Sequence, residues 1–196
     1  MRLSTLKVTM CILTAALLSP LGLLASTSDC SGTPSALSNT WDFRREATEL
    51  LEDVHARAAQ VLSYADTLEA LDRDGPLAFW QDHAEQLSDI RDNVNKMGAS
   101  LCRLQAIKSA ASPWQQQAID RIVPRAMDLA TETDAAIKLL NEHQAVIYAL
   151  SEYSTDVKGI FSSADGVVNS VRQFPEYAQA RKEIEKPLKS AAVSGM

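Results

Sequence analysis

Seven apolar residues at alternating spacings of four and three constrain this chain more than any other feature. This spacing gathers side chains on one face of an α-helix, whereas a strand needs alternation with period two. We therefore expect a long amphipathic helix over residues 40–71, followed by a turn at 72–76 that ends one helix and lets another begin. The seven residues are Ala47, Leu51, Val54, Ala58, Val61, Ala65 and Leu68.

Two more segments carry the same helical periodicity. Apolar residues recur every three or four positions over 76–110, where Gly98 interrupts the pattern and suggests a close approach of another helix. A third helix is expected to begin with Ser112 as N-cap and Gln115 completing a capping box, with Pro at the first helical position. Pro124 should kink this helix without ending it, because the apolar pattern continues beyond it.

A fourth helix is expected after a break at 141–151. Ser151 is its predicted N-cap, and the helix should end near residue 173, before a Phe-Pro pair. Four helices of roughly 25–35 residues with short connections predict an all-α fold, namely an antiparallel up-down four-helix bundle over 40–175. Residues 176–196 are expected to form a C-terminal tail that includes a short charged helix.

The composition agrees with a helical, globular chain and narrows its partners. The 196 residues include 7 Gly and 7 Pro, and so few helix breakers favour long helices over many short strands. The formal net charge is −6 at pH 7, and no block of basic residues interrupts the sequence. Nucleic acid and anionic lipid surfaces are therefore poor candidates as partners.

The first 25 residues have the pattern of an export signal. Arg2 and Lys7 precede an apolar run over 8–24, and small residues then begin near Ala25. We expect cleavage there, a short N-terminal arm over 26–39, no membrane association of the mature chain, and a periplasmic or secreted location. Leu23 stands where a signal peptidase prefers a small residue, so an uncleaved N-terminal anchor is the alternative.

Export changes the interpretation of the cysteines. Cys11 would leave with the signal, and an even pair, Cys30 and Cys102, would reach an oxidising compartment. Ten extended residues span about 33 Å, so the arm could fold back and bring Cys30 to Cys102 as a disulfide. The alternative is two unrelated thiols. Trp41 and Trp114 are expected at the same end of the bundle, either as packing that closes it or as an interaction end.

No motif of a known catalytic or cofactor site occurs in the sequence. The chain lacks a Gly-x-Ser-x-Gly elbow, a phosphate-binding Gly-rich loop and a Cys-x-x-Cys-His haem motif. Only one Glu-x-x-His occurs, Glu52 to His55, where a di-iron bundle needs two, so a surface pair is the simpler interpretation. In an antiparallel bundle His55 and His83 would be offset by about 15 Å. Met97 with a histidine could ligate haem, but a Met at a core position is usually packing. We expect no cofactor and no metal.

The middle of the chain resembles a group of uncharacterised secreted helical proteins of soil acidobacteria. This resemblance covers the second and third helices and implies export and a helical fold, with no activity attached. The residues that carry it are His83-x-x-Gln86-Leu87, Val94-Asn95-x-Met97-Gly98, Leu101-Cys102-Arg103-Leu104, Pro113-Trp114 and Ala118-Ile119-Asp120-Arg121-Ile122.

These patterns favour a non-enzymatic binding or structural module. Its unidentified partner would be another protein, docked on helix faces or at the Trp41 and Trp114 end. A metal- or haem-carrying bundle is the alternative, and it would need inward-facing ligands from at least two helices at one height. An enzyme with an unrecognised site would need a pocket with clustered titratable groups.

Overall fold

The structure is a computed structural model that describes residues 42–193, with side chains as far as residue 184. The expected signal, the arm, Cys30 and Trp41 lie outside these residues. Residues 42–193 contain helices and turns but no strand, which confirms the all-α prediction. The elements are α1 (Phe43–Asp74), η1 (Gly75–Leu77), α2 (Trp80–Ile107), η2 (Lys108–Ala110), α3 (Pro113–His143), η3 (Gln144–Ala149), α4 (Ser151–Arg172) and α5 (Pro175–Val193).

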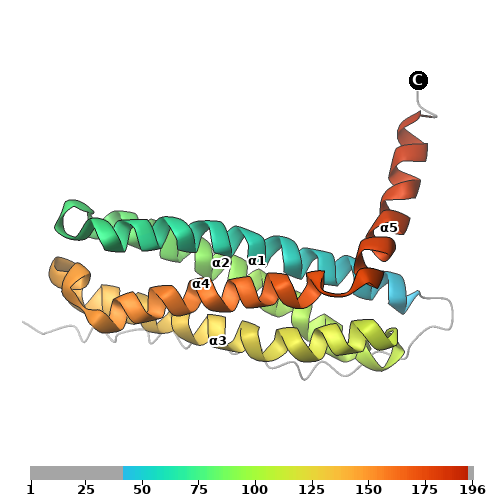
Figure 1. Ribbon diagram of the computed structural model, residues 1–196, viewed down its shortest axis with the longest axis horizontal. Coiled ribbons are helices and arrows are strands. Elements are labelled where there is room, and N and C mark those ends of the chain that lie inside the picture. The colour runs from blue at the N-terminus through green and yellow to red at the C-terminus, as the bar shows by residue number, and fades with distance from the viewer. Residues whose placement is uncertain (1–41, 194–196) are drawn as a thin grey trace, which may run out of the picture.

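Five helices pack against each other in an elongated arrangement. Helix α1 packs along α2 and α4, and α3 packs along α4 and α2, so each of these four has two neighbours. Consecutive helices among the four run in opposite directions, and α5 leaves them at a steep angle (Figure 1). We call the end formed by η1 and η3 the turn end, and the end where α1 and α3 begin the open end.

The apolar stripe of α1 forms the centre of the core. All seven residues predicted from the spacing are fully buried. Buried residues of α2, α3 and α4 join them in one cluster that runs from the turn end to the open end, where Tyr177 of α5 completes it. The helices are held together chiefly because their packing removes this apolar surface from water.

The helix boundaries follow local chemistry. Gly75 has φ 58°, in the left-handed region that favours glycine, and it ends α1. The predicted capping box opens α3, where Gln115 Oε1 accepts from the Ser112 backbone N–H at 2.8 Å. The helix continues through Pro124 for 31 residues in all, as the unbroken pattern predicted.

Several predicted details of the helices are wrong. Helix α2 starts at Trp80 and not at residue 76, because the 3-10 turn η1 and an extended Phe79 come first. Leu150, not Ser151, is the N-cap of α4, since its extended backbone bonds back into η3 and leaves Ser151 as the first helical residue. Gly98 does not mark a close approach, because no atom of another helix lies within 4 Å of where its Cβ would be.

The C-terminal helix is longer than expected. Helix α5 has 19 residues and begins at Pro175, whose fixed φ suits the first position of a helix. Among the described residues, no helix combines the length and the uncharged apolar stretch that a bilayer crossing needs.

Candidate functional site

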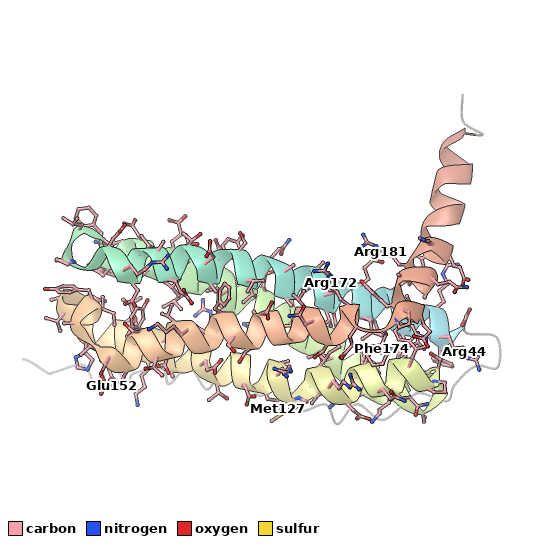
Figure 2. All side chains as sticks on the ribbon, viewed as in Figure 1. Arg44, Met127, Glu152, Arg172, Phe174 and Arg181 are labelled. Carbon is pink, nitrogen blue, oxygen red and sulfur yellow. The ribbon has the colours of Figure 1, made fainter. Side chains whose placement is uncertain are left out.

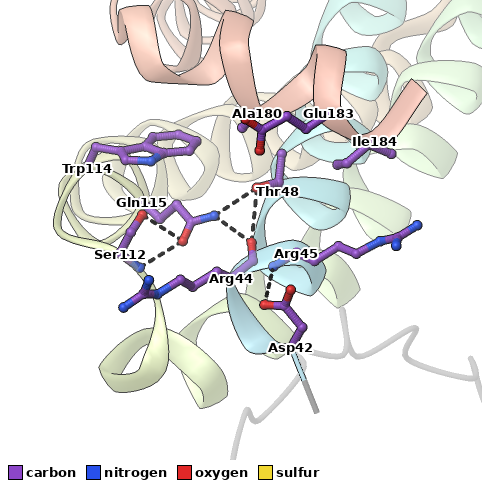
Figure 3. A pocket seen from close by; sticks show the side chains of 10 residues that line it. All are labelled: Asp42, Arg44, Arg45, Thr48, Ser112, Trp114, Gln115, Ala180, Glu183 and Ile184. Atoms are coloured by element: carbon purple, nitrogen blue, oxygen red, sulfur yellow. Dashed lines mark hydrogen bonds between the residues drawn. The ribbon is translucent and has the colours of Figure 1, made fainter. Parts of the chain in front are cut away.

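A hollow of about 490 Å³ lies at the open end, between the starts of α1 and α3 and the side of α5 (Figure 3). Three segments far apart in the sequence form it, so it exists only in the folded chain. Its lining residues are Asp42, Arg44, Arg45, Thr48, Ser112, Trp114, Gln115, Ala180, Glu183 and Ile184.

Gln115 fixes two walls of the hollow relative to each other. Its side chain is buried, and its Nε2 donates to the Arg44 carbonyl at 2.7 Å and to Thr48 Oγ1 at 2.9 Å. Its Oε1 accepts from both the backbone N–H and the hydroxyl of Ser112 at 2.8 Å (Figure 3). The amide that caps α3 therefore also joins α3 to α1, and it holds this part of the hollow in one geometry.

Trp114 is both a packing residue and part of the hollow's lining. Its ring lies 6.1 Å from that of Phe174 and 6.5 Å from that of Tyr177, at inclined angles typical of aromatic pairs. The side chain is half-buried. The Arg121 guanidinium covers the Phe174 ring at 5.2 Å. These neighbours hold the indole in place while part of it lines the hollow.

The charges around the hollow are mixed. The carboxylate of Asp42 caps α1 by accepting from the Arg45 backbone N–H at 3.1 Å, and the Arg45 side chain pairs with Glu49 at 3.0 Å. Arg44 and Glu183 form no ion pair with another described residue. Arg44 and Trp114 both line this hollow, so it offers a cationic and an aromatic residue to a ligand that has an anionic group and an apolar group.

A second, buried cluster of polar groups lies near the turn end. His83 Nδ1 and the Tyr153 hydroxyl are 2.9 Å apart, and Ser154 Oγ donates to Asp72 Oδ2 at 2.7 Å. His83 Nε2 and Asp72 Oδ1 are buried and have no hydrogen-bond partner among the described residues. Burial lowers the pKa of His83, although Asp72 and Asp82 act against that shift, and burial raises the pKa of Tyr153.

The sequence carried a signal for this cluster that the prediction missed. His83 lies four residues before Leu87 and is therefore in register with the apolar stripe of α2, next to the half-buried Ala84. A histidine in a core register is most often bonded to another buried polar group, and here that group is Tyr153 on α4.

His55 lies nearer the open end, at the base of α5. Its ring is 5.9 Å from that of Tyr177, and its Nε2 is buried without a hydrogen-bond partner among the described residues. Burial lowers the pKa of His55, and Arg172 and Arg181 lower it further. Glu52 forms an ion pair at 3.0 Å with Arg181 of α5, so the predicted Glu52 and His55 pair is not formed.

The histidines do not gather at one place. His83 is bonded to Tyr153, His55 lies against Tyr177, and His143 is exposed at the end of α3. Within the described part of the chain, no three or more His, Cys, Asp or Glu side chains are arranged so that they could hold a metal ion.

Of the site residues predicted from the sequence, Trp114 and Cys102 are among the described residues, and Trp41 and Cys30 are not. Trp114 lines the hollow, while Trp41, its expected neighbour, lies outside the described residues. Cys102 is half-buried on α2, five residues before that helix ends at Ile107. Its proposed partner Cys30 is outside the described residues, so the disulfide stays a prediction.

The chain matches no protein-family model, no curated protein and no solved structure. The resemblance to secreted acidobacterial proteins therefore stays a prediction.

Proposed function

We propose that this chain is an exported, non-enzymatic binding module built on an antiparallel up-down four-helix bundle, and that its open end binds a segment of a protein partner. One observation carries the proposal: Trp114 and Arg44 both line the same hollow, between three helices that meet only in the folded chain. Hollows that combine an aromatic surface with a few fixed polar groups are typical of ligand sites.

The chemistry of the hollow favours a peptide segment as the ligand. Arg44 suits a carboxylate, because a guanidinium can donate two parallel hydrogen bonds to it. The Trp114 indole and the Ile184 side chain suit an apolar residue beside that carboxylate. Glu183, on the opposite wall, suits a backbone N–H or a basic group. An acidic peptide with one apolar side chain offers all of these groups in a short length.

A peptide selection on the protein exported by its own signal tests this function. Peptides chosen from a random display library would be measured against Arg44→Glu and against Arg91→Glu, which changes another exposed arginine, in the middle of α2. We expect Arg44→Glu to weaken binding by about tenfold or more, the loss typical of one charge-assisted contact. Arg91→Glu should leave it unchanged. Peptides that bind equally well to both variants would contradict the proposal, as would a selection that yields none.

The proposed export and disulfide have a separate test. The N-terminal mass of exported protein reports whether the signal at 1–25 is removed, and non-reducing digestion followed by mass spectrometry reports the Cys30 to Cys102 link. A linked peptide pair would tie the arm to α2. Two free thiols in folded, exported material would refute the disulfide without affecting the binding proposal.

An absorption spectrum with elemental analysis separates this proposal from the metal- or haem-carrying alternative. The sample would be exported protein purified without chelators. A colourless protein without stoichiometric metal is the expected result. A Soret band or one equivalent of metal would replace the proposal and make His55, His83 and Met97 the first residues to mutate.

A further inference from the structure

Exposed apolar side chains are concentrated at the turn end, opposite the hollow. Of six large apolar side chains exposed among the described residues, five lie there, and the sixth, Met127, lies apart on α3 (Figure 2). Single exposed apolar residues are ordinary, whereas a group of them marks an interaction surface. We call this group the turn-end patch: Leu77, Phe79, Trp80, Val146 and Tyr148.

The turn-end patch is one surface, although it comes from two connections. Leu77, Phe79 and Trp80 belong to the α1–α2 connection and the start of α2, and the other two residues belong to η3, which contacts both η1 and α2. Phe79 is 72% exposed and Leu77 is 84% exposed. Covering two such side chains provides a large part of the binding free energy of a small interface.

Both connections are held in a defined shape. In the first, Gly75 makes the sharp turn, and the Ala78 and Asp82 backbone N–H groups donate to the carbonyls of Gly75 and Phe79 at 3.1 and 3.0 Å. In the second, the Leu150 backbone N–H donates to the Ile147 carbonyl at 3.1 Å. Beneath the patch, the hydrogen bond between His83 and Tyr153 joins α2 to α4, just past the two connections. Because the apolar side chains stand on a fixed frame, little conformational entropy is lost when a partner covers them.

The residues around the turn-end patch are acidic. The two segments 72–82 and 142–152 contain five carboxylates and one arginine, Arg73. Asp74, Asp82, Glu142 and Glu152 are exposed, and Figure 2 shows Glu152 near this end. A second copy of the chain would place the same acidic rim against itself, and an anionic membrane would repel it. A basic protein surface is the complement.

We propose that the turn-end patch is a docking surface for a protein that presents an apolar cluster surrounded by lysine and arginine. The partner's apolar side chains cover Leu77, Phe79 and Tyr148, and its cations face Asp74 and Glu142. This surface is separate from the hollow at the open end, so the chain has two sites of different chemistry.

A matched pair of synthetic peptides tests this surface on the exported, full-length protein. One is an amphipathic helix of about 18 residues, with leucine and tryptophan on one face and lysine on the other. The second has glutamate in place of every lysine. Nuclear magnetic resonance of the tryptophan indole N–H groups shows which end is contacted. We expect the lysine peptide to shift the Trp80 signal and leave the Trp114 signal in place.

Two variants and their controls decide the outcome. Phe79→Ser, and Asp74→Lys combined with Glu142→Lys, should each weaken binding of the lysine peptide by at least about tenfold. All three positions are exposed, and a basic residue in the last turn of α1 or α3 suits the helix dipole, so these variants should fold. Met127→Ser, and Asp92→Lys combined with Asp134→Lys, change exposed residues elsewhere and should leave binding unchanged.

Four results would overturn the proposal. Equal binding of the lysine and glutamate peptides, or no binding of the lysine peptide, would refute the proposal that the partner is basic. Binding to neutral phosphatidylcholine vesicles that Phe79→Ser abolishes would assign the patch to a lipid surface. A dimer seen by analytical ultracentrifugation and lost in Phe79→Ser would assign it to self-association. None of these results bears on the hollow, whose ligand is tested through Arg44.

Discussion

His83 is a buried side chain, and among the described residues its ring is hydrogen-bonded through one nitrogen. Its Nδ1 meets the Tyr153 hydroxyl at 2.9 Å, while Nε2 has no partner among the described residues. A neutral ring satisfies more of this environment than an imidazolium, which would carry two N–H donors and a charge into the core. Burial therefore keeps the ring uncharged, and the Tyr153 bond is the main polar contact that fixes its orientation.

Tyr153→Phe should lower the free energy of unfolding by about 1–3 kcal/mol, because it leaves His83 Nδ1 buried without a partner. Urea unfolding followed by circular dichroism measures the change. Tyr148→Phe removes a hydroxyl from an exposed tyrosine of the turn end and should stay within about 0.5 kcal/mol of the wild type. Equal losses in the two variants would mean that the buried bond contributes nothing specific.

The stability should also depend on pH through His83. Burial holds the pKa of His83 below its ordinary value of 6.5. Between pH 6.5 and the lowered pKa, His83 is therefore protonated in the unfolded chain and neutral in the folded chain. The free energy of unfolding therefore has its full value above pH 6.5 and falls as the pH drops toward the lowered pKa, by at most about 1.4 kcal/mol per pH unit for one proton.

His83→Gln separates this effect from the other groups that titrate. The pKa of His55 is also lowered by burial, so His55 too makes the free energy of unfolding fall as the pH drops. Burial raises the pKa of Glu132 and Asp156, so the folded chain takes up their protons first and gains stability as the pH falls. Between pH 7.5 and 5.5, the free energy of unfolding measured with urea should fall less for His83→Gln than for the wild type. Equal slopes would refute the role of His83.

At the level of the helices, α3 and α4 pack through two glycines. A Cβ on Gly159 would lie 2.6 Å from Glu132 Oε1, and one on Gly166 would lie 2.9 Å from the Arg125 Cδ atom. The two glycines are seven residues apart on α4, and their two neighbours are seven residues apart on α3. Seven residues make about two helical turns, so both contacts lie on the same face of each helix. The missing side chains let a charged residue of α3 lie against the backbone of α4.

Gly98→Ala and Gly159→Ala should therefore differ in sign or size. Alanine is favoured over glycine in a helix by about 1 kcal/mol, and Gly98 has open space around it, so Gly98→Ala should raise the free energy of unfolding by roughly that amount. Gly159→Ala has to displace the Glu132 side chain and should gain less or lose stability.

The second half of this test is a double-mutant cycle with Glu132→Ala, measured by urea unfolding. Without the glutamate side chain, Gly159→Ala should raise the free energy of unfolding by about as much as Gly98→Ala does. A Gly159→Ala gain that is the same with and without Glu132 would show that the two side chains do not compete for this space.

The helices could be predicted from the sequence because their signals are local. The stripe from Ala47 to Leu68 and the capping box of Ser112 and Gln115 need only a few neighbouring residues, and both predictions are confirmed. Gly98 and Gly159 look alike in the sequence. What distinguishes them is the side chain of another helix, and single-helix periodicity carries no information about which residues of two helices face each other.

The candidate site could be predicted only in part, for the same reason. The helical pattern placed Trp114 at the open end, but the hollow also needs α5, which the sequence pattern assigned to a C-terminal tail. The second bond of Gln115, to the Arg44 carbonyl, spans 71 positions. At the turn end the exposed residues of η3 fell in a segment that was expected only as a break, and a break carries no pattern from which exposure can be read.

Over the whole molecule, the two ends differ in chemistry and are separated by the length of the helices. Helix α1 has 32 residues and is therefore about 48 Å long. A mixed-charge hollow lies at one end, and an apolar patch with an acidic rim lies at the other. If both proposals hold, a partner at each end would be kept apart by a helical rod, which is a structural role that needs no chemistry at the centre.

A rod that keeps two partners at a fixed distance has to stay folded along its whole length, so its two ends should not unfold separately. The buried cluster runs without interruption from Leu87 near the turn end to Leu104 near the open end, and both residues lie on α2. We expect their backbone amides to exchange with deuterium only through global unfolding, with the same free energy as urea unfolding gives. Native-state exchange followed by nuclear magnetic resonance measures both in one sample. A Leu104 value more than about 1 kcal/mol below that of Leu87 would show that the open end opens alone. The hollow would then be a mobile site that its ligand orders, and its affinity would carry the cost of that ordering.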